Sequence, residues 1–245
     1  MEWVVLYFIG FIATTLGTLA GGGGLINLPA MLLLGIPIHS AIGANKVSNT
    51  VSSFSSFFVL LKRKRISLKD CIWIMPLSLA GGAAGGLIAT KLSGQHLYIL
   101  AIILLLFAFI TSFLGKGDFS GEERLKLGKV SIPGLFGIGM YDGLFGPGQG
   151  TLMLYLFSYL KISYIQAVGY VRFATFFSCL GAAVTYIASG NIIWPLTIAL
   201  LLGSVTGAQL GVRIAEKINP KYVKPILRIV TIALIIQIVI ENVHI

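Results

Sequence analysis

The chain has 245 residues, of which 56% are hydrophobic and 11% charged, and its formal net charge is +10. A mean hydropathy of +0.93 excludes an ordinary soluble domain and is typical of a membrane protein. The Lys and Arg residues stand mainly in short loops between apolar runs. Such a distribution orients a membrane protein and does not indicate a nucleic-acid partner. We therefore expect a multi-pass integral membrane protein that contacts the lipid bilayer along most of its length.

Apolar segments follow one another along nearly the whole chain, and most are long enough to cross about 30 Å of hydrocarbon. We expect helices over residues 4–20, 25–36, 41–61, 71–90 and 97–114 in the first half, and over 132–146, 151–160, 165–188, 193–215 and 225–240 in the second. Two of these, 25–36 and 151–160, are too short to span, and each follows a glycine-rich break at 21–24 or 146–150. Irregular backbone at membrane depth is tolerated only where it lines a cavity inside the protein.

The two halves of the chain are related by a shift of 126 residues without a gap. The shift superposes Gly17 on Gly143, Gly24 on Gly150, Ala41 on Ala167, Gly43 on Gly169, Ser52 on Ser178, Gly81 on Gly207 and Lys91 on Lys217. We predict two structural repeats, residues 1–114 and 130–245, joined by a hydrophilic cytoplasmic linker over residues 115–129. Each repeat would bring its glycine break to a common centre.

Basic residues predict that equivalent loops face opposite sides of the membrane. Residues 62–65 are all basic, whereas the equivalent loop, 189–191, is uncharged; conversely, loop 91–96 has one Lys and its counterpart has three. Because basic loops stay in the cytoplasm, this pattern favours inverted repeats with an odd number of crossings each. The expected fold is an all-α polytopic membrane protein of two inverted repeats, each with a Gly-broken re-entrant hairpin and three transmembrane helices. A hairpin that crosses fully twice stays open as an alternative.

Glycines also recur four residues apart away from the breaks. They are Gly81, Gly82, Gly85 and Gly86 in the first repeat and Gly203, Gly207 and Gly211 in the second. Small residues at this spacing let two helix backbones approach closely. We predict helix contacts at these positions, in preference to a binding role.

Three ionisable residues lie inside apolar segments. Lys46 is about one and a half turns into its helix, and the shift of 126 residues places it on Arg172. A cation at the centre of a membrane helix costs about 2.5–3.5 kcal/mol and is functional by default, with snorkelling to the headgroups as the alternative. We expect Asp142 to neutralise Lys46 or Arg172 while no substrate is bound; a proton relay is the alternative.

The glycine breaks favour anion binding, because a helix that starts there presents free N–H groups and the positive end of its dipole. The candidate binding residues are Gly23, Gly24, Asn27, Asn45, Lys46, Asn49, Gly148, Gln149, Gly150, Arg172, Thr175 and Ser178. Ordinary bonding between helices is the alternative for the amides and hydroxyls. A cavity with these donors and two cations suits a small oxyanion. The sequence has no metal-ligand spacing and no catalytic arrangement at membrane depth, so we expect no cofactor, no metal and no enzyme.

The first repeat carries Gly-Gly-Gly-Gly-x-x-Asn-x-Pro at residues 21–29, then Gly35-Ile36-Pro37, then Ala-Ile-Gly-Ala-Asn-Lys at residues 41–46. With the glycine-rich second half, it resembles the sulfite exporter TauE/SafE family over essentially the whole chain. The resemblance implies secondary transport of sulfur-containing anions, such as sulfite or organosulfonates, across the prokaryotic plasma (inner) membrane. The second repeat departs from the pattern, with Pro147 and Gln149 among the glycines and Tyr155 at the position of Pro29.

We therefore predict an alternating-access transporter of a small anion, bound at the midplane between the two glycine breaks. A passive anion channel is the main alternative, and a scaffolding membrane protein is a weaker one because it leaves the buried cations unexplained. The sequence leaves open the substrate, the direction of transport, a coupled proton or sodium ion, and whether the chain forms a homo-oligomer.

Overall fold

The structure is a computed structural model that describes residues 2–20, 24–114, 119, 125 and 128–217. The regular structure in these ranges is entirely helical. The helices are α1 (Glu2–Ala20), α2 (Gly24–Leu33), α3 (Ile38–Lys62), α4 (Leu68–Cys71), α5 (Ile74–Lys91), α6 (Gly94–Leu114), α7 (Ser131–Leu144), α8 (Gln149–Tyr159), α9 (Tyr164–Ala188) and α10 (Trp194–Ala215).

The apolar segments predicted from the sequence match these helices closely, with one correction. The segment predicted over 71–90 is divided into the short α4 and the longer α5. Pro76 explains the division, because it has no N–H to donate to the carbonyl of Ile72 and its ring clashes with that carbonyl. The helix predicted over 225–240 and most of the 115–129 linker lie outside the described residues.

The bounds of α3 repeat in those of α9. Adding 126 to the bounds of α3 gives 164 and 188, which are the bounds of α9. The turns repeat as well: Gly35 and Lys161 have positive φ of 73° and 57°, and Lys64 and Gly190 have 56° and 73°. Each of these residues ends a helix in the left-handed conformation, where Gly is favoured and Lys is strained.

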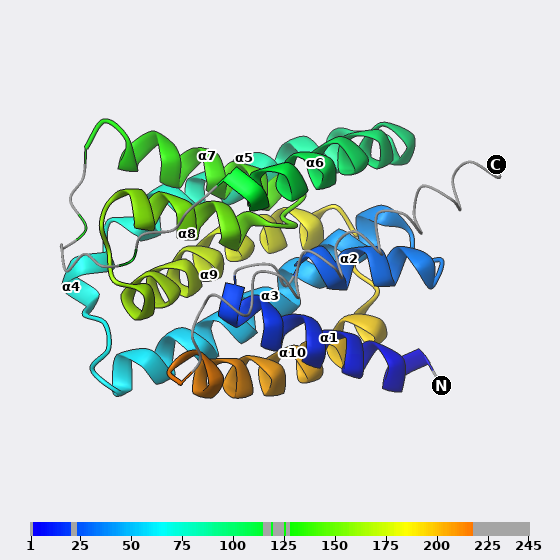
Figure 1. Cartoon of the computed structure of the whole chain (residues 1–245). Helices are drawn as coiled ribbons and strands as arrows, with labels where there is room; N and C mark the ends of the chain where they lie inside the picture. Colours follow the sequence, from blue (N-terminus) through cyan, green and yellow to red (C-terminus); the bar gives the residue numbers. More distant parts are fainter. Residues whose placement is uncertain (1, 21–23, 115–118, 120–124, 126–127, 218–245) are drawn as a thin grey trace.

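The central pair of helices is α3 and α9, which cross in antiparallel directions (Figure 1). Near the start of α3, a Cβ at Gly43 would lie 3.4 Å from the Cβ of Tyr186, near the end of α9. Near the end of α3, the ring of Phe57 lies 4.6 Å from that of Phe173, in the first half of α9. Helices α10 and α5 flank this pair, with α10 against α3 and α5 against α9. The outer helices follow the same plan, since α1 packs along α10 and α7 packs along α5.

The glycines predicted to mark close helix contacts do so. A Cβ at Gly207 would overlap the carbonyl oxygen of Phe11 in α1, and a Cβ at Gly85 would overlap that of Met140 in α7. A Cβ at Gly211 would lie 2.7 Å from the Cβ of Thr18, which is closer than real side chains approach. These positions therefore need Gly for the backbones to meet.

Three of the described helices are long and apolar enough to cross a membrane: Glu2–Leu19 within α1, α9 and α10. Helix α3 has the length of α9 but buries a polar stripe that includes Asn45, Lys46, Ser52 and Ser56. Because polar groups inside a membrane protein face the interior or a cavity, this stripe turns α3 toward the middle of the bundle.

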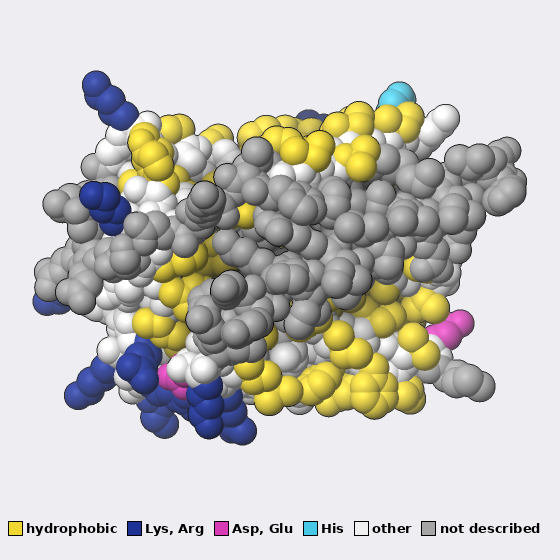
Figure 2. All heavy atoms as spheres, viewed as in Figure 1, with side chains coloured by type: hydrophobic (Ala, Val, Ile, Leu, Met, Phe, Trp, Pro, Cys, Tyr) yellow, Lys and Arg dark blue, Asp and Glu magenta, His cyan; other side chains and the backbone are white. Residues whose placement is uncertain are grey.

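Lys and Arg side chains gather at one end of the molecule, where α3 and α10 end (Figure 2). Arg63 and Arg65 both pair with Glu216 there, Arg65 at 3.4 Å. This contact joins the end of α3 to the end of α10.

Candidate functional site

An internal cavity of about 30 Å³ lies where α1, α2, α3, α7, α8 and α9 approach one another. Its lining residues are Thr14, Gly17, Gly24, Asn49, Asp142, Gly146, Gln149, Gly150, Val171, Arg172 and Thr175. The two glycine breaks therefore meet: Gly24, the first residue of α2, lies against the second break, where a Cβ on it would be 3.2 Å from the Cα of Pro147. The volume suits about two water molecules, so a bound oxyanion needs the surrounding side chains to move outward.

The second break contains two glycines in a backbone conformation that favours Gly. Gly146 and Gly148 have φ of 101° and 80°, in the region that favours Gly. A Cβ on Gly146 would collide with the Lys46 ammonium and lie 2.8 Å from an Asp142 oxygen. Helix α8 begins directly after Gly148, so the positive end of its dipole lies at the cavity wall.

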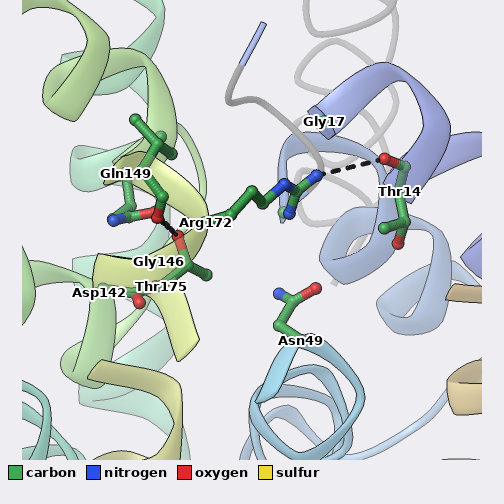
Figure 3. Close-up of a pocket in the computed structure, with 11 residues that line it drawn as sticks. Thr14, Gly17, Asn49, Asp142, Gly146, Gln149, Arg172 and Thr175 are labelled. Atoms are coloured by element: carbon green, nitrogen blue, oxygen red, sulfur yellow. Dashed lines mark hydrogen bonds between the residues drawn. The ribbon is translucent and has the colours of Figure 1, made fainter. Parts of the chain in front are cut away.

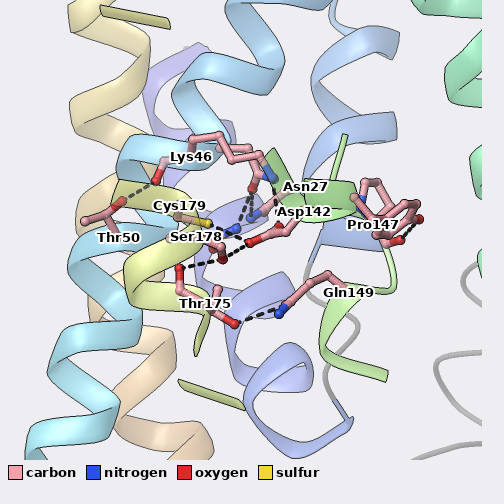
Figure 4. Close-up of polar contacts among 12 residues, drawn as sticks. Asn27, Lys46, Thr50, Asp142, Pro147, Gln149, Thr175, Ser178 and Cys179 are labelled. Atoms are coloured by element: carbon pink, nitrogen blue, oxygen red, sulfur yellow. Dashed lines mark hydrogen bonds and ion pairs between the residues drawn. The ribbon is translucent and has the colours of Figure 1, made fainter. Parts of the chain in front are cut away.

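A buried ion pair joins α3 to α7 beside the cavity (Figure 4). The Nζ of Lys46 on α3 lies 2.9 Å from Oδ1 of Asp142 on α7, and the side chains are 0% and 4% exposed. The other carboxylate oxygen accepts hydrogen bonds from the hydroxyl of Ser178 and from the thiol of Cys179, the latter at 3.4 Å. Four groups from α3, α7 and α9 thus form one polar network.

Arg172 is buried on α9 and holds a different set of partners (Figure 3). Its guanidinium donates to the hydroxyl of Ser53 at 3.3 Å, to the carbonyl of Thr14 at 3.5 Å and to the hydroxyl of Thr18. All three partners are neutral. Among the described residues Arg172 forms no ion pair, so its positive charge is left for whatever occupies the cavity.

Amide and hydroxyl groups complete the wall. Asn27 and Asn49 both donate to the amide oxygen of Asn45, at 3.2 and 3.1 Å, and Thr175 donates to the amide oxygen of Gln149 at 3.1 Å. The Nε2 of Gln149 is buried and has no hydrogen-bond partner in the described part of the chain. A buried donor without a partner costs about 1–3 kcal/mol, so this amide at the cavity wall is a candidate contact for a ligand.

Most of the residues predicted from the sequence come together here. Seven of them line the cavity: Gly24, Asn49, Asp142, Gln149, Gly150, Arg172 and Thr175. Five predicted residues do not line the cavity: Asn27, Asn45, Lys46, Gly148 and Ser178. Three of these five, Asn45, Lys46 and Ser178, bond to residues that line it. Gly23 lies outside the described residues. The two cations differ in their surroundings, since Lys46 is paired with Asp142 whereas Arg172 lies at the cavity wall.

Several neighbours were not among the predicted site residues. Thr14 lines the cavity, Thr18 and Ser53 hold Arg172, and Cys179 contacts Asp142. Thr14 and Thr18 are four residues apart in the mostly apolar α1 and so share one face. That spacing was the signal for them. No metal-binding group of three His, Cys, Asp or Glu side chains occurs within the described ranges.

Comparison with known proteins places the chain among membrane transporters. Residues 6–238 match the model of the family described as sulfite exporter TauE/SafE. A probable membrane transporter protein, ORF9, from Sinorhizobium sp is 33% identical over 98% of this chain and 93% of its own length. A probable membrane transporter protein from Haemophilus influenzae is 29% identical over 93% and 90%, and the probable membrane transporter protein YfcA of Escherichia coli K12 is 27% identical over 93% and 86%.

No solved structure gives a significant match to this chain. The family match and the relatives agree with the apolar helices and with the polar cavity between them. The relatives are named probable membrane transporter proteins, and the chain belongs to the sulfite exporter TauE/SafE family.

Proposed function

We propose that this protein is a multi-pass transporter of the prokaryotic plasma (inner) membrane that carries a small anion, a sulfur oxyanion or an organosulfonate, by alternating access. The observation that carries the proposal is Arg172, a buried cation without an acidic partner among the described residues, at the wall of an internal cavity. With Lys46 paired to Asp142, the charges around the cavity sum to one positive charge. A buried unpaired charge is costly, and a bound anion would remove that cost.

The anion would lie among Arg172, the free Nε2 of Gln149, the amide of Asn49 and the first turn of α8. These groups donate hydrogen bonds or present positive charge, and Thr175 orients Gln149 through its hydrogen bond. Oxyanions with several acceptor oxygens suit such a set of donors. The sulfur chemistry of the substrate rests on the family to which the chain belongs.

Alternating access is supported by the internal repetition of the fold. The bounds of α3 become those of α9 after a shift of 126 residues, and these two helices are antiparallel. Helices α1 and α2 form one hairpin and α7 and α8 another, and the two reverse near the middle of the bundle (Figure 1). We infer inverted repeats with re-entrant hairpins, which would rock against each other around the central cavity.

Binding to purified protein tests the site. Sulfite, sulfate, thiosulfate and methanesulfonate would be compared by thermal shift on the wild type, on Arg172→Ala and on Arg213→Ala, which removes an exposed arginine at the end of α10. A ligand at about 100 times its Kd stabilises a folded protein by about 2.7 kcal/mol, which raises Tm by about 5–10 °C at this chain length. We expect this rise in the wild type and in Arg213→Ala but not in Arg172→Ala.

An equal rise in all three proteins would contradict the site. Uptake into proteoliposomes then distinguishes a carrier from a passive anion channel. A carrier saturates with anion concentration and shows exchange of internal for external anion, whereas flux that stays linear and exceeds a carrier cycle would indicate a channel.

A further inference from the structure

Asp142 lies in an unusual position for an anion transporter, because its carboxylate is part of the wall of the cavity that would hold the anion. An anion bound beside Arg172 therefore meets a like charge. A carboxylate next to a second negative charge binds a proton more readily.

The carboxylate is fixed where it is. Lys46 on α3 holds one oxygen at 2.9 Å, and Ser178 and Cys179 on α9 donate to the other. On the side of α5, the neighbouring residue Gly82 lies against the backbone of α7 at Gly143 and brings no charge. Swinging away from an incoming anion would break three polar contacts at once.

The other charged or titratable groups near Asp142 are Arg172 and Cys179 on α9, Lys46 on α3 and Tyr141 on α7 itself. The Tyr141 hydroxyl donates to the backbone carbonyl of Pro147 and is occupied. The net charge around the cavity is therefore the sum of two cations and one carboxylate. A monoanion brings the sum to zero, and a dianion brings it to one negative charge unless Asp142 takes up a proton.

We propose that Asp142 is the proton-binding residue of this transporter and that a dianionic substrate is carried together with one proton on its carboxylate. The proton restores neutrality in the cavity and removes the repulsion between the dianion and Asp142. Lys46 is then left as a second cation beside the anion. This inference rests on the proposed function, and it adds the coupling ion and a distinction between substrates by charge.

Proton uptake on binding gives a direct test. Sulfate and methanesulfonate serve as probes, because neither changes its own charge between pH 6 and 8. Titration calorimetry in two buffers of different ionisation enthalpy measures how many protons enter the protein with each anion. We expect about one proton per sulfate and about none per methanesulfonate. Affinity for sulfate should fall about tenfold for each pH unit over the range in which the proton must be taken up from solution, while affinity for methanesulfonate changes little.

Two variants assign the proton to the residue. Asp142→Asn keeps the shape but cannot titrate, so sulfate binding should lose its proton uptake and its dependence on pH. Glu216→Gln removes an acid of the surface pair, outside the cavity, and leaves Asp142 in place, so proton uptake should persist.

Each other outcome is informative. Sulfate binding without proton uptake in the wild type, or proton uptake that survives in Asp142→Asn, would overturn the inference and leave the proposed anion site intact. If neither anion binds the wild type, the proposed site and the inference both fail. If Asp142→Asn does not fold, the wild-type measurement alone still overturns the inference when sulfate binds without a proton.

Discussion

The Lys46–Asp142 pair allows a quantitative prediction about stability. Its atoms lie 2.9 Å apart and its side chains are 0% and 4% exposed, so water screens the attraction weakly. At an effective dielectric constant of about 20, the Coulomb energy at this separation is about 6 kcal/mol. Most of it offsets the cost of removing both charges from water, so the net contribution of the intact pair is small.

When one partner is removed, the cost of burying the remaining charge is no longer offset by the attraction. Lys46→Met leaves a buried carboxylate unpaired, and Asp142→Asn leaves a buried ammonium unpaired. We expect each to lose about 3–5 kcal/mol, which lowers Tm by about 6–20 °C for a chain of this length. The double variant has neither charge and should recover most of the loss, to within about 1–2 kcal/mol of wild type.

The assay is thermal unfolding of the four proteins in one detergent, without added anion and at a fixed scan rate, because membrane proteins often unfold irreversibly. The surface pair provides the control, since the Arg63 side chain is 41% exposed. Arg63→Ala should cost no more than about 1 kcal/mol. If either buried single variant is as mild as this control, or if the double variant loses the sum of the two, then the pair is not a coupled buried contact and the charge balance of the cavity must be redrawn.

Two further predictions follow from the packing and from the charge. Gly207→Ala should lower Tm strongly, because the new Cβ would overlap a carbonyl oxygen of α1. The control is Gly137→Ala on α7, whose Cβ meets no atom within 4 Å, so it should be neutral or gain up to about 1 kcal/mol in helix propensity. Equal Tm values for the two variants would refute the close contact. The guanidinium of Arg172 donates to the Thr18 hydroxyl, so the carboxylate of Thr18→Asp should pair with Arg172. This variant should weaken anion binding at least tenfold in a titration, whereas the neutral Thr18→Asn should not. Equal affinities would show that the charge of Arg172 does not attract the anion.

The helices were largely predictable because two strong signals agree along this chain. Apolar runs of spanning length predict where helices lie, and Gly or basic residues mark where they end. The end of α3 at Lys62 and the end of α9 at Ala188 follow from these signals. The division of α4 from α5 was missed because the run is apolar throughout, and only Pro76 carries the information.

The sequence predicted which residues belong to the site but not which cation pairs with Asp142. Depth along a helix follows from counting residues, which is how Lys46 and Arg172 were predicted at equivalent positions. Which of them meets Asp142 depends on the rotation of α3 and α9 about their axes and on how deeply α7 enters the bundle. These are set by close contacts such as Gly143 against Gly82. The spacing of small residues predicted a helix contact at Gly82 but not that its partner is Gly143.

The backbone repeats between the two halves, but the charge does not. Equivalent turn positions are left-handed in both halves, whereas the position equivalent to Asp142 is Leu16, which packs in a small apolar cluster with Ala13 and Ala215. An acid in both halves would give each cation its own partner and leave the cavity neutral. A cavity without either acid would hold two unpaired cations and would bind an anion too tightly to release it. One acid for two cations leaves a single positive charge, which is enough to attract an anion. When a dianion and a proton are both bound, loss of the proton from Asp142 would lower the positive charge again and favour release. This asymmetry distinguishes the two halves of the chain chemically, although α3 and α9 have equivalent bounds.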